Sequence, residues 1–206
     1  MTASLYLYLA SQSPRRRQLL EQMGVRHELL LPNAEGDVLE DAEAIEAVLP
    51  GEAPRDYVVR VTGLKLDAAV ARHARRQLPV APILCSDTTV ALGTQILGKP
   101  EDAADAARML RQLAGKTHEV LTAVALQLGA QRLEALSVSQ VTFAAMTDAQ
   151  IAAYVASGEP MGKAGSYGIQ GLAAAHVAHM AGSYSGIMGL PVYETAQLLR
   201  QAGWQL

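Results

Sequence analysis

The chain has 206 residues, of which 50% are hydrophobic and 18% are charged, and its formal net charge is −3. No apolar run approaches the roughly 18 residues that a membrane span needs, so we expect one soluble domain covering residues 1–206, with no membrane partner. The negative charge argues against a surface that binds nucleic acid. The N-terminus lacks the pattern of a secretion signal, so we expect a cytoplasmic protein.

The first twenty residues carry the strongest functional signal. Leu5–Ala10 is an apolar run that predicts a buried strand, and Ser13 with Pro14 predicts the start of a helix that ends at Gly24. A helix N-terminus attracts anions, and Arg15–Arg17 occupy its first turn. Cations are unfavourable at this end of the helix dipole, so the cluster favours a phosphate or carboxylate site over an ordinary solvated surface. Successive helical residues lie about 100° apart, so two of the three arginines can bind one ligand.

An acidic segment and a long helix follow. Arg26–Leu31 predicts a second strand, and Pro32–Pro54 predicts a mobile loop with a short helix near Ala42–Val48. Arg55–Arg76 has a helical period, and Lys65 lies within its apolar stripe. A lysine there either extends its ammonium to water along the aliphatic stem or points into a polar cleft, and the residues alone favour the first.

Val80–Leu92 predicts the central strand, and Asp87 lies in its middle. A buried carboxylate is costly unless it is paired, hydrogen-bonded or metal-bound, so Asp87 needs a partner or a function; the ordinary alternative is a hydrogen bond to a nearby turn. A hairpin through Gln95–Leu97 is expected to return Lys99 close to Asp87. Cys85 is the lone cysteine, so an internal disulfide and a cysteine-based zinc cluster are excluded, and we expect it to be buried.

The second half predicts further regular elements. A helix begins after Asp102, Thr117–Leu128 and Leu133–Ala144 form an antiparallel pair, Thr147 begins a capped helix, and Val192–Ala202 forms the last helix.

Gly158–Gly189 holds eight of the chain's seventeen glycines, which suits a loop whose backbone approaches a ligand closely. It matches neither the phosphate loop nor the dinucleotide fingerprint. His176 and His179 are expected to be packed or surface histidines.

Five blocks of sequence resemble the Maf family of nucleotide pyrophosphatases, in that family's order and across nearly the whole chain. The blocks are Leu9–Arg16, Ser86–Thr88, Gly98–Pro100, Lys163–Gly171 and Gly182–Tyr184 with Gly189–Pro191. The resemblance implies an α/β fold similar to inosine triphosphatases, with an elongated mixed β-sheet flanked by helices and two lobes around a central cleft. It also implies a nucleoside triphosphate pyrophosphatase that uses Mg²⁺ or Mn²⁺ and acts on a small-molecule nucleotide. A homodimer stays open.

The wording around Gln170 resembles the branch of the family that hydrolyses dTTP and UTP and removes non-standard pyrimidine nucleotides. The branch selective for 7-methyl-GTP has an acidic residue at this position. The resemblance further implies roles for individual residues. Catalysis falls on Asp87, Lys65 and Lys99; substrate binding on Ser11, Arg15, Arg16, Thr88, Lys163 and Gln170; and metal binding on Asp87 and Glu35.

Three features depart from the family pattern. Ser86 stands where the family usually has alanine, and the acidic loop from Gly36 to Pro54 is longer than expected. Ser185–Met188 differs from the Asn-Val-Val-like sequence that usually follows Gly-Ser-Tyr. The match of Glu35 to the family's second carboxylate depends on how this longer loop is aligned with the family pattern.

The chemistry of the residues agrees with hydrolysis between the α- and β-phosphates. Arg15 and Arg16 can hold a polyphosphate, Lys65 and Lys99 can offset charge on departing pyrophosphate, and Asp87 can bind a cation or take a proton from water. No histidine lies beside a candidate serine or cysteine nucleophile in the sequence, which favours direct attack by water.

Two alternatives remain: a 7-methyl-GTP pyrophosphatase, and a nucleotide-binding regulator of cell division with little turnover. The two lysines with Asp87 favour catalysis, because a sensor could bind phosphate through the arginines alone.

Overall fold

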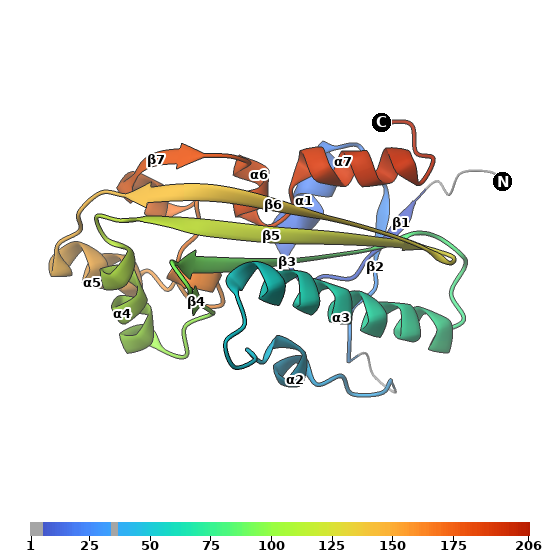
Figure 1. Cartoon of the computed structure of the whole chain (residues 1–206), viewed down its shortest axis with the longest axis horizontal. Helices are drawn as coiled ribbons and strands as arrows, with labels where there is room; N and C mark the ends of the chain where they lie inside the picture. The colour runs from blue at the N-terminus through green and yellow to red at the C-terminus, as the bar shows by residue number, and fades with distance from the viewer. Residues whose placement is uncertain (1–5, 34–36) are drawn as a thin grey trace.

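The computed structural model describes residues 6–33 and 37–206, and within them seven strands form one mixed sheet. The order is β2-β1-β3-β5-β6-β7, and β4 pairs with β3. The long β5 and β6 run the length of the molecule, and helices cover both faces of the sheet (Figure 1). The strands are β1 (Leu7–Leu9), β2 (His27–Leu29), β3 (Ile83–Leu92), β4 (Gln95–Leu97), β5 (Thr117–Leu128), β6 (Gln131–Phe143) and β7 (Val177–Ala181).

Two helices begin at the caps that the sequence predicts. Ser13 accepts a hydrogen bond from the backbone N–H of Arg16, and Thr147 with Gln150 forms a capping box. The helices are α1 (Pro14–Gln22), α2 (Ala42–Glu46), α3 (Pro54–Arg75), α4 (Ala103–Leu113), α5 (Asp148–Ala156), α6 (Tyr184–Met188) and α7 (Val192–Gln201), with 3₁₀ turns at Ala164–Ser166 and Leu172–His176.

Alternation along β1 creates two cores on opposite faces of the sheet. Leu7 and Leu9 pack in one cluster with Leu20 of α1 and Leu199 of α7, whereas Tyr8 packs in another with α3. Successive side chains of a strand point to opposite faces, so three residues of β1 attach helices to both. Figure 1 shows α3 along one face and α1, α6 and α7 along the other.

One edge of β3 is interrupted at its centre. β1 pairs in parallel with β3 only at Ile83 and Leu84, and β4 pairs antiparallel with β3 only from Val90 onward. Between these points, no strand among the described residues pairs with this edge, although β5 pairs with the other edge throughout. The opening lies beyond the carboxyl end of β1, where open α/β sheets commonly bind ligands.

The mixed α/β architecture confirms the expected fold class, and the antiparallel pair appears as β5 and β6. Cys85 is buried, as expected. Within Pro32–Pro54, the short helix expected near Ala42–Val48 is confirmed as α2. Ion pairs attach the described part from Asp37 onward to Arg60 and Arg72 of α3 and to Arg76 just after it. No helix within the described residues is long and apolar enough to cross a membrane.

A buried histidine lies in the core beyond β4. His118 of β5 is 2% exposed, its Nε2 lies 2.8 Å from the Tyr167 hydroxyl, and its ring meets Phe143 and Tyr167 edge to face. Its Nδ1 has no hydrogen-bond partner among the described residues. Burial lowers the pKa of His118 to about 4, so the folded protein holds this ring neutral.

We predict that His118 makes stability depend on pH. Its folded pKa lies below the ordinary unfolded value of about 6.5, so between these two values the unfolded chain binds more protons and stability falls as pH falls. The difference amounts to about 3 kcal/mol at most. Urea unfolding from pH 7.5 to pH 4.5 should show this slope in the parent and a weaker slope in His118→Gln. The exposed His179→Gln is the control, and equal slopes in all three proteins would contradict the prediction.

Candidate active site

A cleft of about 610 Å³ opens at the interrupted edge of β3. Among the described residues that line it, cationic side chains outnumber carboxylates by six to three, although the whole chain carries a net charge of −3. The cations are Arg15, Arg16, Lys65, Arg72, Lys99 and Lys163, and the carboxylates are Glu40, Glu46 and Asp87. The excess of cationic side chains suits an anionic ligand, and the carboxylates can bind a cation that accompanies it.

Arg16 ties the start of α1 to two other elements. Its Nε donates to the Gly189 carbonyl at 2.7 Å, its Nη1 to Ser11 Oγ at 3.1 Å and its Nη2 to Thr88 Oγ1 at 3.4 Å. Burial lowers the pKa of Arg16, and the nearby Asp87 acts in the opposite direction. The guanidinium thus has a defined place at the base of the cleft.

The other two arginines of α1 lie in different surroundings. Arg15 also lines the cleft, and its Nε donates to the Met188 carbonyl at 3.3 Å. Arg17 is exposed and lies 3.9 Å from Glu21 on the outer face of α1. The prediction that only two of the three can serve one site agrees with this arrangement.

Lys65 joins two carboxylates across the cleft. Its Nζ donates to Asp87 Oδ1 at 2.5 Å and to Glu46 Oε1 at 2.6 Å. The expectation that Lys65 extends to bulk water is therefore wrong. Lys99, which the hairpin was expected to return close to Asp87, lines the same cleft, and its Nζ pairs with Glu46 at 3.0 Å. The two lysines meet at Glu46.

The pKa values of this group follow from competing effects. Burial would raise the pKa of Glu46, but hydrogen bonds from Lys65 and Lys99 outweigh it and lower the pKa. Burial would lower the pKa of Lys65, but Asp87 and Glu46 outweigh it and raise the pKa. Glu46 and Lys65 are therefore both charged near neutral pH.

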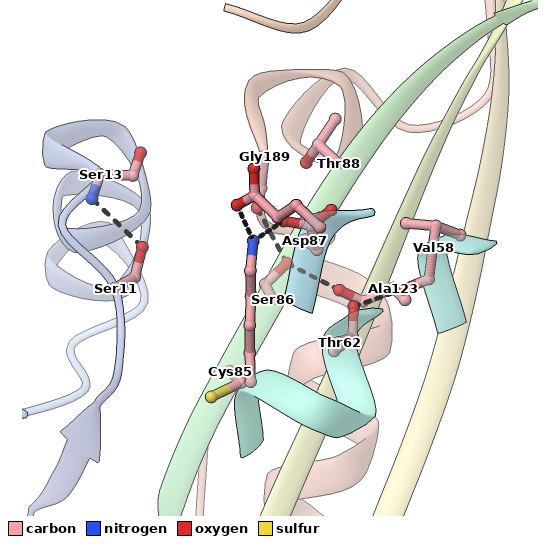
Figure 2. Close-up of polar contacts among 12 residues, drawn as sticks. Ser11, Ser13, Val58, Thr62, Cys85, Ser86, Asp87, Thr88, Ala123 and Gly189 are labelled. Carbon is pink, nitrogen blue, oxygen red and sulfur yellow. Dashed lines mark hydrogen bonds and ion pairs between the residues drawn. The ribbon is translucent and has the colours of Figure 1, made fainter. Parts of the chain in front are cut away.

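The two neighbours of Asp87 on β3, Ser86 and Thr88, connect this strand to the turn at Gly189 and to Arg16. Ser86 Oγ donates to the Ala123 carbonyl at 2.8 Å and lies 3.0 Å from the Gly189 carbonyl (Figure 2). Thr88 Oγ1 accepts from Arg16 and, at 3.0 Å, from Thr122. The hydroxyl at Ser86, where alanine was expected, thus holds the turn that carries Gly189.

Two of the expected binding residues lie in the glycine-rich segment. Lys163 lines the cleft, and its Nζ donates to the Glu159 carbonyl. Burial and the nearby Arg15 lower the pKa of Lys163. Gln170 is exposed and is not among the described residues that line the cleft. The structure therefore brings together Ser11, Arg15, Arg16, Thr88 and Lys163 with Asp87, Lys65 and Lys99, but leaves Gln170 outside.

Glu35 lies outside the described residues. The described carboxylate opposite Asp87 is Glu46, which the sequence analysis did not select. The available signal was weak: an acidic residue within the short helix predicted near Ala42–Val48. Glu46 and Asp87 lie far apart in the sequence, so no local pattern indicated that both contact Lys65.

Asp87 and Glu46 fit a hard divalent cation. Both offer carboxylate oxygens, and both already contact one positive group, the ammonium of Lys65. The described residues contain no group of three or more histidine, cysteine, aspartate or glutamate side chains that could form a metal site alone. Two carboxylates suffice for Mg²⁺, which commonly takes its remaining ligands from water and substrate phosphates.

An open α/β sheet with a cationic cleft and a pair of carboxylates defines a class of proteins that bind phosphorylated small molecules. The chain belongs to the Maf family, because a family model described as "Maf-like protein" matches residues 6–202.

Several curated proteins are similar to this chain over nearly its full length. A dTTP/UTP pyrophosphatase of Albidiferax ferrireducens is 64% identical over 98% of this chain and 100% of its own length. A protein of the same name from a Polaromonas species is 65% identical over the whole of both chains, and one from Ralstonia nicotianae is 66% identical over 96% of this chain and 94% of its own.

We predict that the arginines of α1 contribute unequally to anion binding. Arg15→Ala and Arg16→Ala should weaken binding of inorganic tripolyphosphate by roughly ten- to a hundredfold, the scale of a lost charge-assisted contact of about 1.5–3 kcal/mol. Arg17→Ala should change it by less than about twofold, because a surface ion pair contributes little. Calorimetric titration of the three variants measures this, and equal losses would indicate a diffuse basic surface instead of a site.

Proposed function

We propose that this chain hydrolyses dTTP and UTP to the nucleoside monophosphate and pyrophosphate. The observation that carries the proposal is the contact of Lys65 with both Asp87 and Glu46, inside a cleft that also contains Arg15 and Arg16. The shared name of the full-length relatives supports the substrate.

The phosphates would bind at the start of α1. The positive end of its dipole favours an anion, and Arg15 and Arg16 add fixed positive charge. Lys65 and Lys99 lie on the other side of the cleft, where they can offset the charge that grows on departing pyrophosphate. Lys163 and Ser11 complete the polar lining.

Asp87 would act as the general base that takes a proton from the attacking water. Its neighbours on β3 are held by Arg16, Ala123 and Gly189, so the carboxylate has a fixed direction. Asp87 and Glu46 would hold Mg²⁺ or Mn²⁺, which supplies positive charge to the phosphates when bound. Hydrogen bonds from Lys65 and Lys99 outweigh burial and lower the pKa of Glu46, so this carboxylate stays ionised. A covalent nucleophile is not required.

The base would occupy the apolar end of the cleft. That end is lined by Val90, Val120, Ala164, Tyr167, Ile169 and Ile187. Gly165, with φ +65°, lets this wall approach β3, because an added Cβ would lie 2.8 Å from a methyl group of Val90. These apolar side chains offer a surface against which a nucleobase can pack.

We predict that Asp87→Asn abolishes hydrolysis. Asparagine keeps the shape of the side chain but cannot take a proton, so turnover of UTP should fall roughly a hundredfold or more. Release of pyrophosphate is the measurement, and thermal unfolding checks that the variant is folded. Turnover within about threefold of the parent would remove the proposed role of Asp87.

The second carboxylate can be identified with a matched pair. Glu46→Gln should raise the Mn²⁺ concentration needed for half-maximal activity by at least about tenfold, since it removes a charged oxygen ligand. Glu35→Gln is the comparison, because the resemblance to the family implies that Glu35 binds the metal. A larger effect from Glu35→Gln would assign the role to Glu35.

We predict that Gln170→Glu reduces the preference for UTP over CTP by roughly tenfold, with little change in thermal stability. A carboxamide can match the N3–H and O4 of thymine or uracil, whereas cytosine presents the opposite pattern, and mispaired groups in a closed site cost about 1–3 kcal/mol. This role requires the exposed Gln170 side chain to turn into the cleft. An unchanged UTP to CTP ratio would leave selection to the apolar pocket.

A panel of dTTP, UTP, CTP, GTP and 7-methyl-GTP tests the proposed function directly. Pyrophosphate release that is fastest from dTTP and UTP supports it. Fastest release from 7-methyl-GTP would favour the other branch of the family, and tight nucleotide binding without release would favour a regulator.

A further inference from the structure

The position of Glu46 depends on contacts from outside its own helix. Glu46 is the last residue of α2, which has only five residues. Isolated helices of this length are unstable in water, because the cost of nucleation is not recovered over so few hydrogen bonds. Several of the contacts that locate Glu46 come instead from α3, and Lys99 adds another.

Two residues of α3 bind backbone carbonyls at the C-terminal end of α2. The Tyr57 hydroxyl donates to the Glu46 carbonyl at 2.9 Å, and Arg60 Nη2 donates to the next carbonyl, that of Ala47, at 2.8 Å. Arg60 also binds both carboxylate oxygens of Glu52, at 2.6 and 2.7 Å. Tyr57 and Arg60 are not among the described residues that line the cleft.

The Tyr57 side chain packs in the core. The residue is only 9% exposed and belongs to a buried hydrophobic cluster, so its hydroxyl is held in place. Loss of the hydroxyl alone would therefore free the Glu46 carbonyl without removing the ring.

The other flank of the same segment is held by a buried arginine. Arg72 is 3% exposed, donates to both carboxylate oxygens of Glu40 at 2.8 and 2.5 Å, and donates to the Leu30 carbonyl. Arg76, just beyond α3, pairs with Asp37 at 2.7 Å. The segment from Asp37 to Glu52 is thus attached on both sides of Glu46.

One face of α3 provides the central contacts. Tyr57, Lys65 and Arg72 follow at intervals of eight and seven residues, so their side chains leave the helix within about 80° of one another along about 22 Å of its length. The helix that directs Lys65 at Asp87 therefore also sets where Glu46 meets Lys65.

We propose that Tyr57 and Arg60 are positioning residues that hold the Glu46 carboxylate opposite Asp87, so that the affinity for a divalent cation depends on contacts made outside the cleft. This inference rests on the proposed function, in which Asp87 and Glu46 hold the cation. It adds residues that touch neither substrate nor metal.

The test measures Mn²⁺ binding to the nucleotide-free protein by calorimetry, together with the Mn²⁺ dependence of UTP hydrolysis. Tyr57→Phe should weaken Mn²⁺ binding three- to tenfold and leave kcat at saturating Mn²⁺ within about twofold. Arg60→Gln should act in the same direction, and Arg60→Lys should restore part of the affinity because it keeps the charge. A purely structural role would lower thermal stability without this separation between metal affinity and kcat.

Arg111→Gln is the matched control. It breaks an ion pair between Arg111 of α4 and Asp148 of α5. The described residues of the segment from Asp37 to Glu52 form no hydrogen bond or ion pair with either helix. Its Mn²⁺ affinity should equal that of the parent. Unchanged affinity in both Tyr57→Phe and Arg60→Gln, with a loss in Glu46→Gln, would overturn the positioning proposal alone. Unchanged affinity in Glu46→Gln would overturn the assignment of Glu46 and, with it, the positioning proposal.

Discussion

The interrupted edge of β3 is the constraint on which the site depends. A continuous sheet would direct Asp87 and its neighbours to opposite faces with a layer of strands between them. Here β1 ends before Asp87 and β4 begins after it, so both faces open into one cleft. Arg16 can therefore reach Thr88 from α1 on one side, while Lys65 reaches Asp87 from α3 on the other.

Charge compensation decides how that opening is filled. An aspartate in a central strand would be costly without partners, and a lysine on the apolar face of a helix would be equally unfavourable. Their contact resolves both, and the second carboxylate comes from a segment that ion pairs attach to α3. The cleft therefore retains a local excess of positive charge in a negatively charged protein, which suits a polyphosphate with its cation.

The part of the site that could be predicted is the part that follows from local rules. The N-cap at Ser13 and the different directions of Arg15 and Arg17 follow from helix geometry over a few residues. The need of Asp87 for a partner follows from the cost of burying charge. Glu46 could not be predicted in this way, because its role depends on a short helix held by residues far along the chain.

The sequence by itself determined most of the strands and helices, the arginine pair at the start of α1 and the unusual carboxylate in β3. These depend on periodicity, capping and burial, which act between neighbouring residues. Only the tertiary structure decided that Lys65 pairs with Asp87 and Glu46, across 22 and 19 residues, and that Lys99 meets Glu46. It also left Gln170 exposed and outside the described lining of the cleft. Such contacts depend on where the sheet is interrupted and how α3 lies across it, and no local pattern encodes either.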